Sequence, residues 1–213
     1  MKLTKEQLAM LETPCVILDV AQARRNIEAM QAAADAAGCA LRPHIKTHKM
    51  AVFARMQVEA GAQGITCAKV SEAETMAAGG LRDIFIAYPM VGAFRIRRAL
   101  ALAPKLDRLI LAVDSWECAR ELSDAAQAAG LCLEVRLEID TGAGRTGVPL
   151  EHAAALAQHA LHFLAQIDLL RAERLIIERH ICVSRDAEDR LFEHIVHFEN
   201  AVREGEEYVL GHK

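Results

Sequence analysis

Arg42-Pro43-His44-Ile45-Lys46-Thr47-His48-Lys49 places a lysine just past a short apolar run, where a β-strand would end and a loop begin. A partly desolvated lysine amine in such a place can attack a carbonyl carbon and form a Schiff base. A second cation nearby, Lys49, would favour the uncharged and nucleophilic form of the amine. Lys46 is therefore the candidate nucleophile, and the alternative from the residues alone is an ordinary solvated lysine at a strand end.

Short β-rich runs alternate with longer Ala-rich segments of helical period on both sides of this stretch, over the first 150 residues. This alternation is typical of repeated βα units around a parallel sheet. Several of the runs are apolar at consecutive positions, which suits a sheet that is covered on both faces. We expect strands at 40–44, 64–68, 83–88, 108–113 and 132–139, and helices at 21–37, 50–60, 71–78, 93–102 and 115–129.

The lysine stretch resembles the pyridoxal phosphate (PLP) motif of the D-threonine aldolase and D-serine dehydratase family. Two further segments resemble parts of that family in the same order: TPCVILD at 13–19, its first strand, and DTGAGRTGV at 140–148, a later strand and loop. The resemblance covers about residues 10 to 158. It implies an α/β fold, namely an incomplete TIM-type (β/α) barrel of the alanine-racemase N-terminal type.

Beyond the resemblance the chain reads as helix, with expected helices at 152–167, 169–181 and 189–202. We therefore expect two parts, a PLP-binding partial barrel at 1–158 and a helical C-terminal tail at 159–213. A TIM barrel has eight strands and only five βα units are expected here. This shortfall suggests a truncated or rearranged chain.

The resemblance also implies a chemistry and a set of site residues. Lys46 would form the Schiff base with PLP, Arg145 would contact the phenolic oxygen of the cofactor, and His44 would line the site. The implied function is a PLP-dependent lyase acting on D-β-hydroxy amino acids. The sequence does not decide between retro-aldol cleavage of D-threonine and dehydration of D-serine.

The resembled family also uses a divalent metal, whose ligands lie far downstream in a C-terminal β domain. No segment of this sequence matches those ligands, so we expect no ligands for this metal in the chain. We therefore expect its turnover of substrate to be impaired or absent. Two histidine pairs at helical spacing, His159 with His162 and His194 with His197, are weak metal candidates because no Glu-x-x-His or H-E-x-x-H motif accompanies them.

Two other functions and one structural reading remain open. The chain could be a non-catalytic PLP-binding protein. The segment 142–147 also has the form G-x-G-x-x-G, which in a Rossmann fold would bind a dinucleotide, although there it opens the fold and here it follows four βα units. Arg145 could instead be a loop arginine that pairs with Glu138 or Asp140.

Charge and hydropathy narrow the range of partners. The formal net charge is -4 and basic residues are scattered among acidic ones, which argues against nucleic-acid binding. The N-terminal residues lack the apolar core of a leader, and no run approaches the length of a membrane span. We expect a cytoplasmic protein whose partner is a small D-amino acid, with no membrane contact; a homodimer is compatible with these features.

Overall fold

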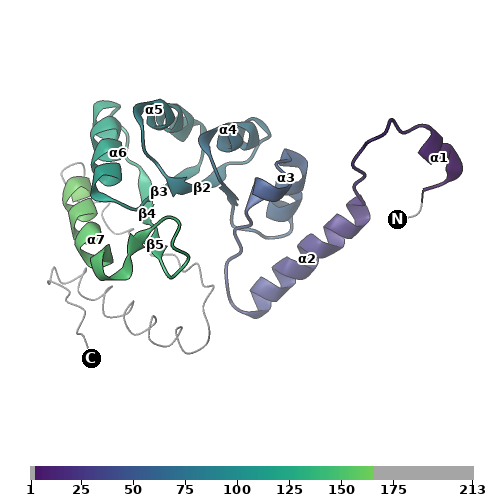
Figure 1. Cartoon of the computed structure of the whole chain (residues 1–213), viewed down its shortest axis with the longest axis horizontal. Coiled ribbons are helices and arrows are strands. Elements are labelled where there is room, and N and C mark those ends of the chain that lie inside the picture. The colour runs from purple at the N-terminus through teal and green to yellow at the C-terminus, as the bar shows by residue number, and fades with distance from the viewer. Residues whose placement is uncertain (1–2, 166–213) are drawn as a thin grey trace.

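A computed structural model describes residues 3–165 of the chain, and the side chains within 158–165 are left out of the description. Its centre is a parallel sheet in the order β1-β2-β3-β4, formed by Ile65–Cys67, Asp83–Pro89, Arg108–Val113 and Glu134–Leu137. Helices α4 (Val70–Ala78), α5 (Ala93–Leu102) and α6 (Trp116–Ala128) connect successive strands and lie side by side along the sheet (Figure 1). The expected α/β architecture is confirmed.

The remaining elements flank this sheet. Before β1 in the chain come four elements: α1 (Lys5–Ala9), α2 (Val20–Ala36), the 3₁₀ turn η1 (Ile45–Thr47) and α3 (Ala51–Glu59). A second 3₁₀ turn, η2 (Ala103–Lys105), lies between α5 and β3. After β4, a separate parallel pair is formed by β5 (Ile139–Asp140) and β6 (Val148–Pro149), and α7 (Leu150–Ala165) follows. Within residues 3–165 the strands do not close into a ring, as expected for an incomplete barrel.

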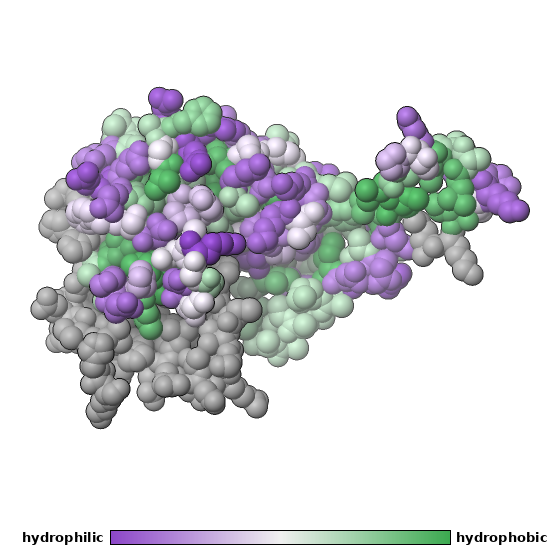
Figure 2. Space-filling model, viewed as in Figure 1, coloured by the Kyte–Doolittle hydropathy of each residue, from purple (hydrophilic) through white to green (hydrophobic). Residues whose placement is uncertain are grey.

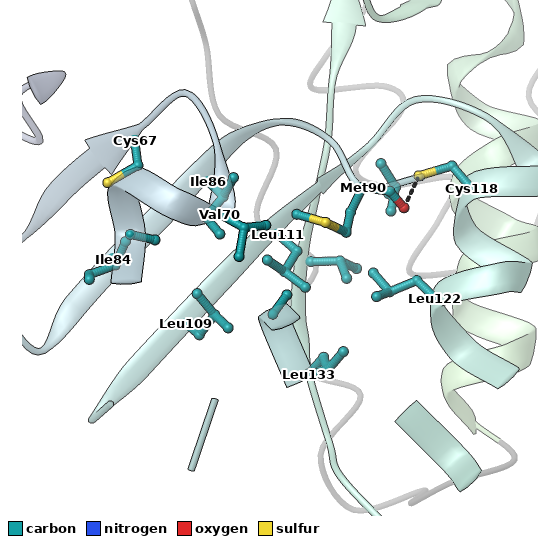
Figure 3. Close-up of a cluster of buried hydrophobic side chains, with 14 of the residues drawn as sticks. Cys67, Val70, Ile84, Ile86, Met90, Leu109, Leu111, Cys118, Leu122 and Leu133 are labelled. Atoms are coloured by element: carbon teal, nitrogen blue, oxygen red, sulfur yellow. Dashed lines mark hydrogen bonds between the residues drawn. The ribbon is translucent and has the colours of Figure 1, made fainter. Parts of the chain in front are cut away.

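The larger hydrophobic core lies between the sheet and the helices. Alternate residues of the central strands, including Ile84, Ile86 and Leu111, are fully buried there against helical side chains such as Val70 and Leu122 (Figure 3). Each such side chain contributes about 1.5–3 kcal/mol to stability when it is fully buried. This core explains the runs of consecutive apolar residues, because the opposite face of the sheet is covered as well.

The opposite face of the sheet carries a smaller apolar cluster and a row of charges. Phe85, Ile110 and Ala112 form the cluster. The charges lie at the N-terminal edge, where β2 begins with Asp83, β3 with Arg108 and β4 with Glu134.

Arg42 extends this row of charges, which we call the charge ladder (Arg42, Asp83, Arg108 and Glu134). The Arg42 guanidinium donates to both Asp83 carboxylate oxygens at 2.7 and 3.1 Å. Arg108 donates to both Glu134 carboxylate oxygens at 2.7 and 2.6 Å and lies 3.7 Å from Asp83 Oδ2. Opposite charges therefore face each other between neighbouring segments.

Two expected strands differ from the structure. Residues 13–19 form no strand, and Val16 is 90% exposed, because no strand of the described chain lies beside them to pair their backbone groups. Figure 2 shows hydrophobic side chains gathered at the surface of this N-terminal arm. Residues 40–44 reduce to one parallel bridge, His44 with Thr66, and Pro43 has no N–H to donate to a ladder.

The expected helices agree with the structure to within about two residues as far as α7. The expected strand 132–139 is shorter and divides into β4 and β5. The expected helices 169–181 and 189–202, and the side chains of both histidine pairs, lie outside the described residues.

The charge ladder passes over Gly64, just before β1, and leaves no space there for a side chain. A Cβ at residue 64 would overlap the Arg42 guanidinium and would lie 2.7 Å from the Asp83 carbonyl oxygen and 2.8 Å from its Cγ. We expect Gly64→Ala to lower the free energy of unfolding by about 2–3 kcal/mol in urea titrations, because a backbone atom must move.

Gly130→Ala is the matched control, since that glycine has a positive φ of 65° but open space around a Cβ. Its strain alone costs about 1–2 kcal/mol. Equal losses in the free energy of unfolding at the two positions would show that the side chain of Arg42 does not need the space above Gly64.

Candidate functional site

Lys46 lies on η1, directly after the bridge between His44 and Thr66. Ile45 is fully buried and anchors this turn in the core, whereas the Lys46 side chain is exposed. The described residues thus present the amine to solvent without the partial desolvation that the sequence suggested. The amine is nevertheless at the carboxyl end of a parallel segment, where active sites of (β/α) barrels are found.

Two histidine rings hold the backbone on either side of Lys46. His44 Nδ1 accepts the Lys46 N–H at 3.2 Å, and His48 Nδ1 accepts the Met50 N–H at 3.1 Å. The His48 ring also packs edge-on against Phe53 of α3, with centroids 5.8 Å apart. Burial lowers the pKa of His48. A nitrogen that accepts a hydrogen bond must be unprotonated, so both contacts require the neutral ring.

Lys49 closes the turn on its C-terminal side. Its N–H donates to the Ile45 carbonyl at 2.8 Å, and its ammonium lies 3.2 Å from a Glu72 carboxylate oxygen. The other Glu72 oxygen accepts the Ala68 N–H at 2.9 Å. Burial acts to raise the pKa of Glu72, but the Ala68 N–H and the Lys49 ammonium outweigh burial and hold that pKa below its usual value. The cation expected to act on Lys46 is therefore already paired.

The glycine loop at 142–147 is organised by its own carboxylate. Asp140 accepts the N–H groups of Gly142 at 2.9 Å and Gly144 at 3.0 Å, and these bonds lower the Asp140 pKa. Gly147 donates to Asp114 Oδ2, at the end of β3, at 3.4 Å. These backbone donors, which a dinucleotide phosphate would need, are occupied within the protein. The loop geometry does not favour the Rossmann interpretation.

Arg145 is exposed on this loop and makes no ion pair with Glu138 or Asp140 among the described residues. Glu138 instead accepts the Thr146 hydroxyl at 2.6 Å. The loop follows β4 and β5, so Arg145 belongs to the same carboxyl edge of the fold as Lys46. Tyr88, near the C-terminal end of β2, is also at this edge and is 46% exposed.

Two charged residues were not found by sequence reasoning. Glu72 lies on α4 and has no motif that marks it. Arg136 is 4% exposed, and its guanidinium carbon lies 4.9 Å from the centre of the Phe85 ring. Burial, followed by the charges of Arg42 and Arg108, lowers the Arg136 pKa to about 10. Its signal was the alternation of Glu134, Arg136 and Glu138 in a run whose other residues are apolar.

Within residues 3–165, no group of three or more His, Cys, Asp or Glu side chains is arranged to hold a metal ion. None of the helices in that part of the chain is long and apolar enough to cross a membrane.

Comparison with known proteins places this geometry in a family context. A family model described as alanine racemase, N-terminal domain, matches residues 18–207, and so continues past residue 158, where the resemblance was expected to end. D-threonine aldolase of Arthrobacter sp. is 40% identical over 156 residues, which are 73% of this chain and 41% of that protein. D-threo-3-hydroxyaspartate dehydratase of Delftia sp. (strain HT23) is 40% identical over 144 residues, 68% of this chain and 38% of that protein.

Solved structures agree with the sequence matches. The D-threonine aldolase from Filomicrobium marinum superposes with a TM-score of 0.65 at 31% identity, covering 80% of this chain and 56% of that one. The dehydratase from Delftia sp. HT23 superposes with a TM-score of 0.69 at 36% identity, covering 79% and 43%. The chain spans about two fifths of the length of the curated relatives described here. The resemblance to the D-threonine aldolase family and the partial barrel are confirmed.

The neutral His48 ring makes stability depend on pH. Because the folded state lowers its pKa below the ordinary 6.5, the unfolded chain binds more protons as the pH falls through that value. His48 should therefore contribute a loss of stability that begins below about pH 6.5 and levels off below its folded pKa. Urea unfolding at pH 7.5 and 5.5 should show a smaller pH effect for His48→Asn, whose amide oxygen can still accept the Met50 N–H.

His152→Asn, an exposed position at the start of α7, is the control and should leave the pH effect as it is in the wild type. A His48→Asn protein with the full wild-type pH effect would contradict the assignment.

Proposed function

The chain belongs to the alanine racemase N-terminal domain family, and from this premise we propose that it is a PLP-dependent lyase acting on D-β-hydroxy amino acids, with Lys46 as the residue that holds the cofactor. Two relatives that are 40% identical to it are named as a D-threonine aldolase and a D-threo-3-hydroxyaspartate dehydratase. Because this chain covers only about two fifths of each relative, the reactions of those proteins are proposals for this chain.

The placement of Lys46 carries the proposal. The buried Ile45 and the paired Lys49 fix the turn on both sides, so the exposed amine stands on a rigid base at the carboxyl edge of the sheet. A turn whose backbone is held on both sides by packing and hydrogen bonds fixes the point from which the side chain extends, which favours a precise site.

The donor set of this edge fits PLP. A primary amine, Lys46 Nζ, is the group that an aldehyde requires. Arg145 has no acidic partner among the described residues, and its guanidinium stays charged at neutral pH, so it could stabilise the phenolate oxygen of the cofactor. When bound, PLP supplies an electron sink for the bond that is broken. His44 would line the site and hold the Lys46 backbone through Nδ1.

Lys46 Nζ is also the basic atom that the turn offers to a substrate. The Nδ1 atoms of His44 and His48 already accept backbone N–H groups and cannot serve as bases there. A proton taken from Cα, followed by loss of the β-hydroxyl, would lead to dehydration, whereas a proton taken from the β-hydroxyl, with cleavage of the Cα–Cβ bond, would be the retro-aldol reaction. Relatives of both kinds are similar to this chain, so both reactions remain within the proposal.

The first prediction from this proposal concerns cofactor binding. Titration of the full chain with PLP should produce a visible absorption band, and borohydride reduction followed by peptide mapping should place the label on Lys46. Lys46→Ala should lose the band. Lys105→Ala, in η2 at the opposite edge of the sheet, should keep it. A band that persists in Lys46→Ala would show that another amine holds the cofactor.

The second prediction concerns the reaction. With PLP present, turnover should be weak, because the sequence offers no ligands for the metal that the resembled family uses. What turnover there is should consume D-threonine faster than L-threonine, and Lys46→Ala should slow it by about 100-fold or more. Glycine and acetaldehyde indicate retro-aldol cleavage, whereas 2-oxobutyrate and ammonia indicate dehydration. A chain that binds PLP at Lys46 and consumes neither isomer would match the absent turnover expected from the sequence, and it would leave a non-catalytic PLP-binding protein as the alternative function.

A further inference from the structure

Lys49 has an unusual backbone for a lysine. Its φ is 52°, and it is the single non-glycine residue with a positive φ among residues 3–165. Such a conformation is unfavourable for an L-residue and persists where neighbouring contacts enforce it. It lies three residues from Lys46, within the same turn, so whatever holds Lys49 also holds the Lys46 backbone.

Glu72 supplies the side-chain contact of Lys49, in addition to the backbone bond from the Lys49 N–H to the Ile45 carbonyl. It is 6% exposed, and its carboxylate joins three elements: its own helix α4, the end of β1 through the Ala68 N–H, and the turn through the Lys49 ammonium. The Lys49 side chain is 57% exposed, so the fixed partner of the pair is the buried carboxylate. A charged hydrogen bond to a buried acid is stronger than a neutral one.

The charges around this carboxylate are few. Among residues 3–165, Lys49 and Lys69 are the cations that act on Glu72, and Lys49 is the one that pairs with it. Without the carboxylate, the Lys49 charge would act on the Lys46 amine and disfavour its protonated form. Without Lys49, the buried anion would act in the opposite sense.

We propose that Glu72 is a positioning residue for Lys46: through Lys49 it fixes the turn and offsets the second cation beside the nucleophile. The inference rests on the proposed function because it takes Lys46 as the nucleophile. Its test uses the amine itself and needs neither cofactor nor substrate, so the two can fail separately.

The measurement is competitive acylation of the full chain by acetic anhydride at pH 8, with the rate at Lys46 divided by the rate at Lys5, an exposed lysine of α1, from peptide mass spectrometry. Glu72→Gln keeps an oxygen for the Ala68 N–H and loses the charge. We expect it to raise the ratio roughly threefold, as for a partly screened unit charge. Lys49→Met should lower the ratio by a similar factor, and the double variant should return it to within about 1.5-fold of wild type.

Glu74→Gln is the matched control, because Glu74 lies on the same helix and pairs with Arg98 away from the turn. It should leave the ratio unchanged. Opposite shifts in the two single variants, restored in the double variant, are the result that a merely structural role would not produce. Shifts of both single variants in the same direction, or equal effects of Glu72→Gln and Glu74→Gln, would overturn the proposal.

Discussion

The charge ladder is the interaction on which the arrangement of the strands depends. Arg42 reaches Asp83 across the chain segment that carries Gly64, and Arg108 stands between Asp83 and Glu134. Signs alternate from one segment to the next. A strand shifted by one residue would turn its charge to the other face of the sheet, into the apolar core under the helices. Charge pairs of this kind contribute less to net stability than to selecting one register.

The charged side chains at the two edges of the sheet therefore bind different partners. At the N-terminal edge the side chains neutralise one another across the strands. At the carboxyl edge, acidic side chains instead bind backbone N–H groups: Glu72 that of Ala68, Asp140 those of Gly142 and Gly144, and Asp114 that of Gly147. The loops there are held by their own acids, while Lys46 and Arg145 remain exposed.

Some of these features could be predicted from the sequence, and others could not. The helices followed from their 3.6-residue period and the central strands from runs of consecutive apolar residues, whereas the structure shows that Ile84, Ile86 and Leu111 share one core. Residues 13–19 have strand-like composition, yet form no strand, because composition does not provide a neighbour with which to pair. For the same reason Lys49 looked like a free second cation, when it is paired with an acid 23 positions away in the chain.

The sequence by itself determined the α/β class, the alternation of strands and helices, and the lysine motif with its family, since all of these are encoded in residues close together along the chain. The tertiary structure decided how the charges are paired. Glu72 with Lys49, Arg42 with Asp83, and Arg108 with Glu134 join residues 23 to 41 positions apart. Such pairs depend on which strands lie side by side and in which register, and that is settled only when the sheet assembles.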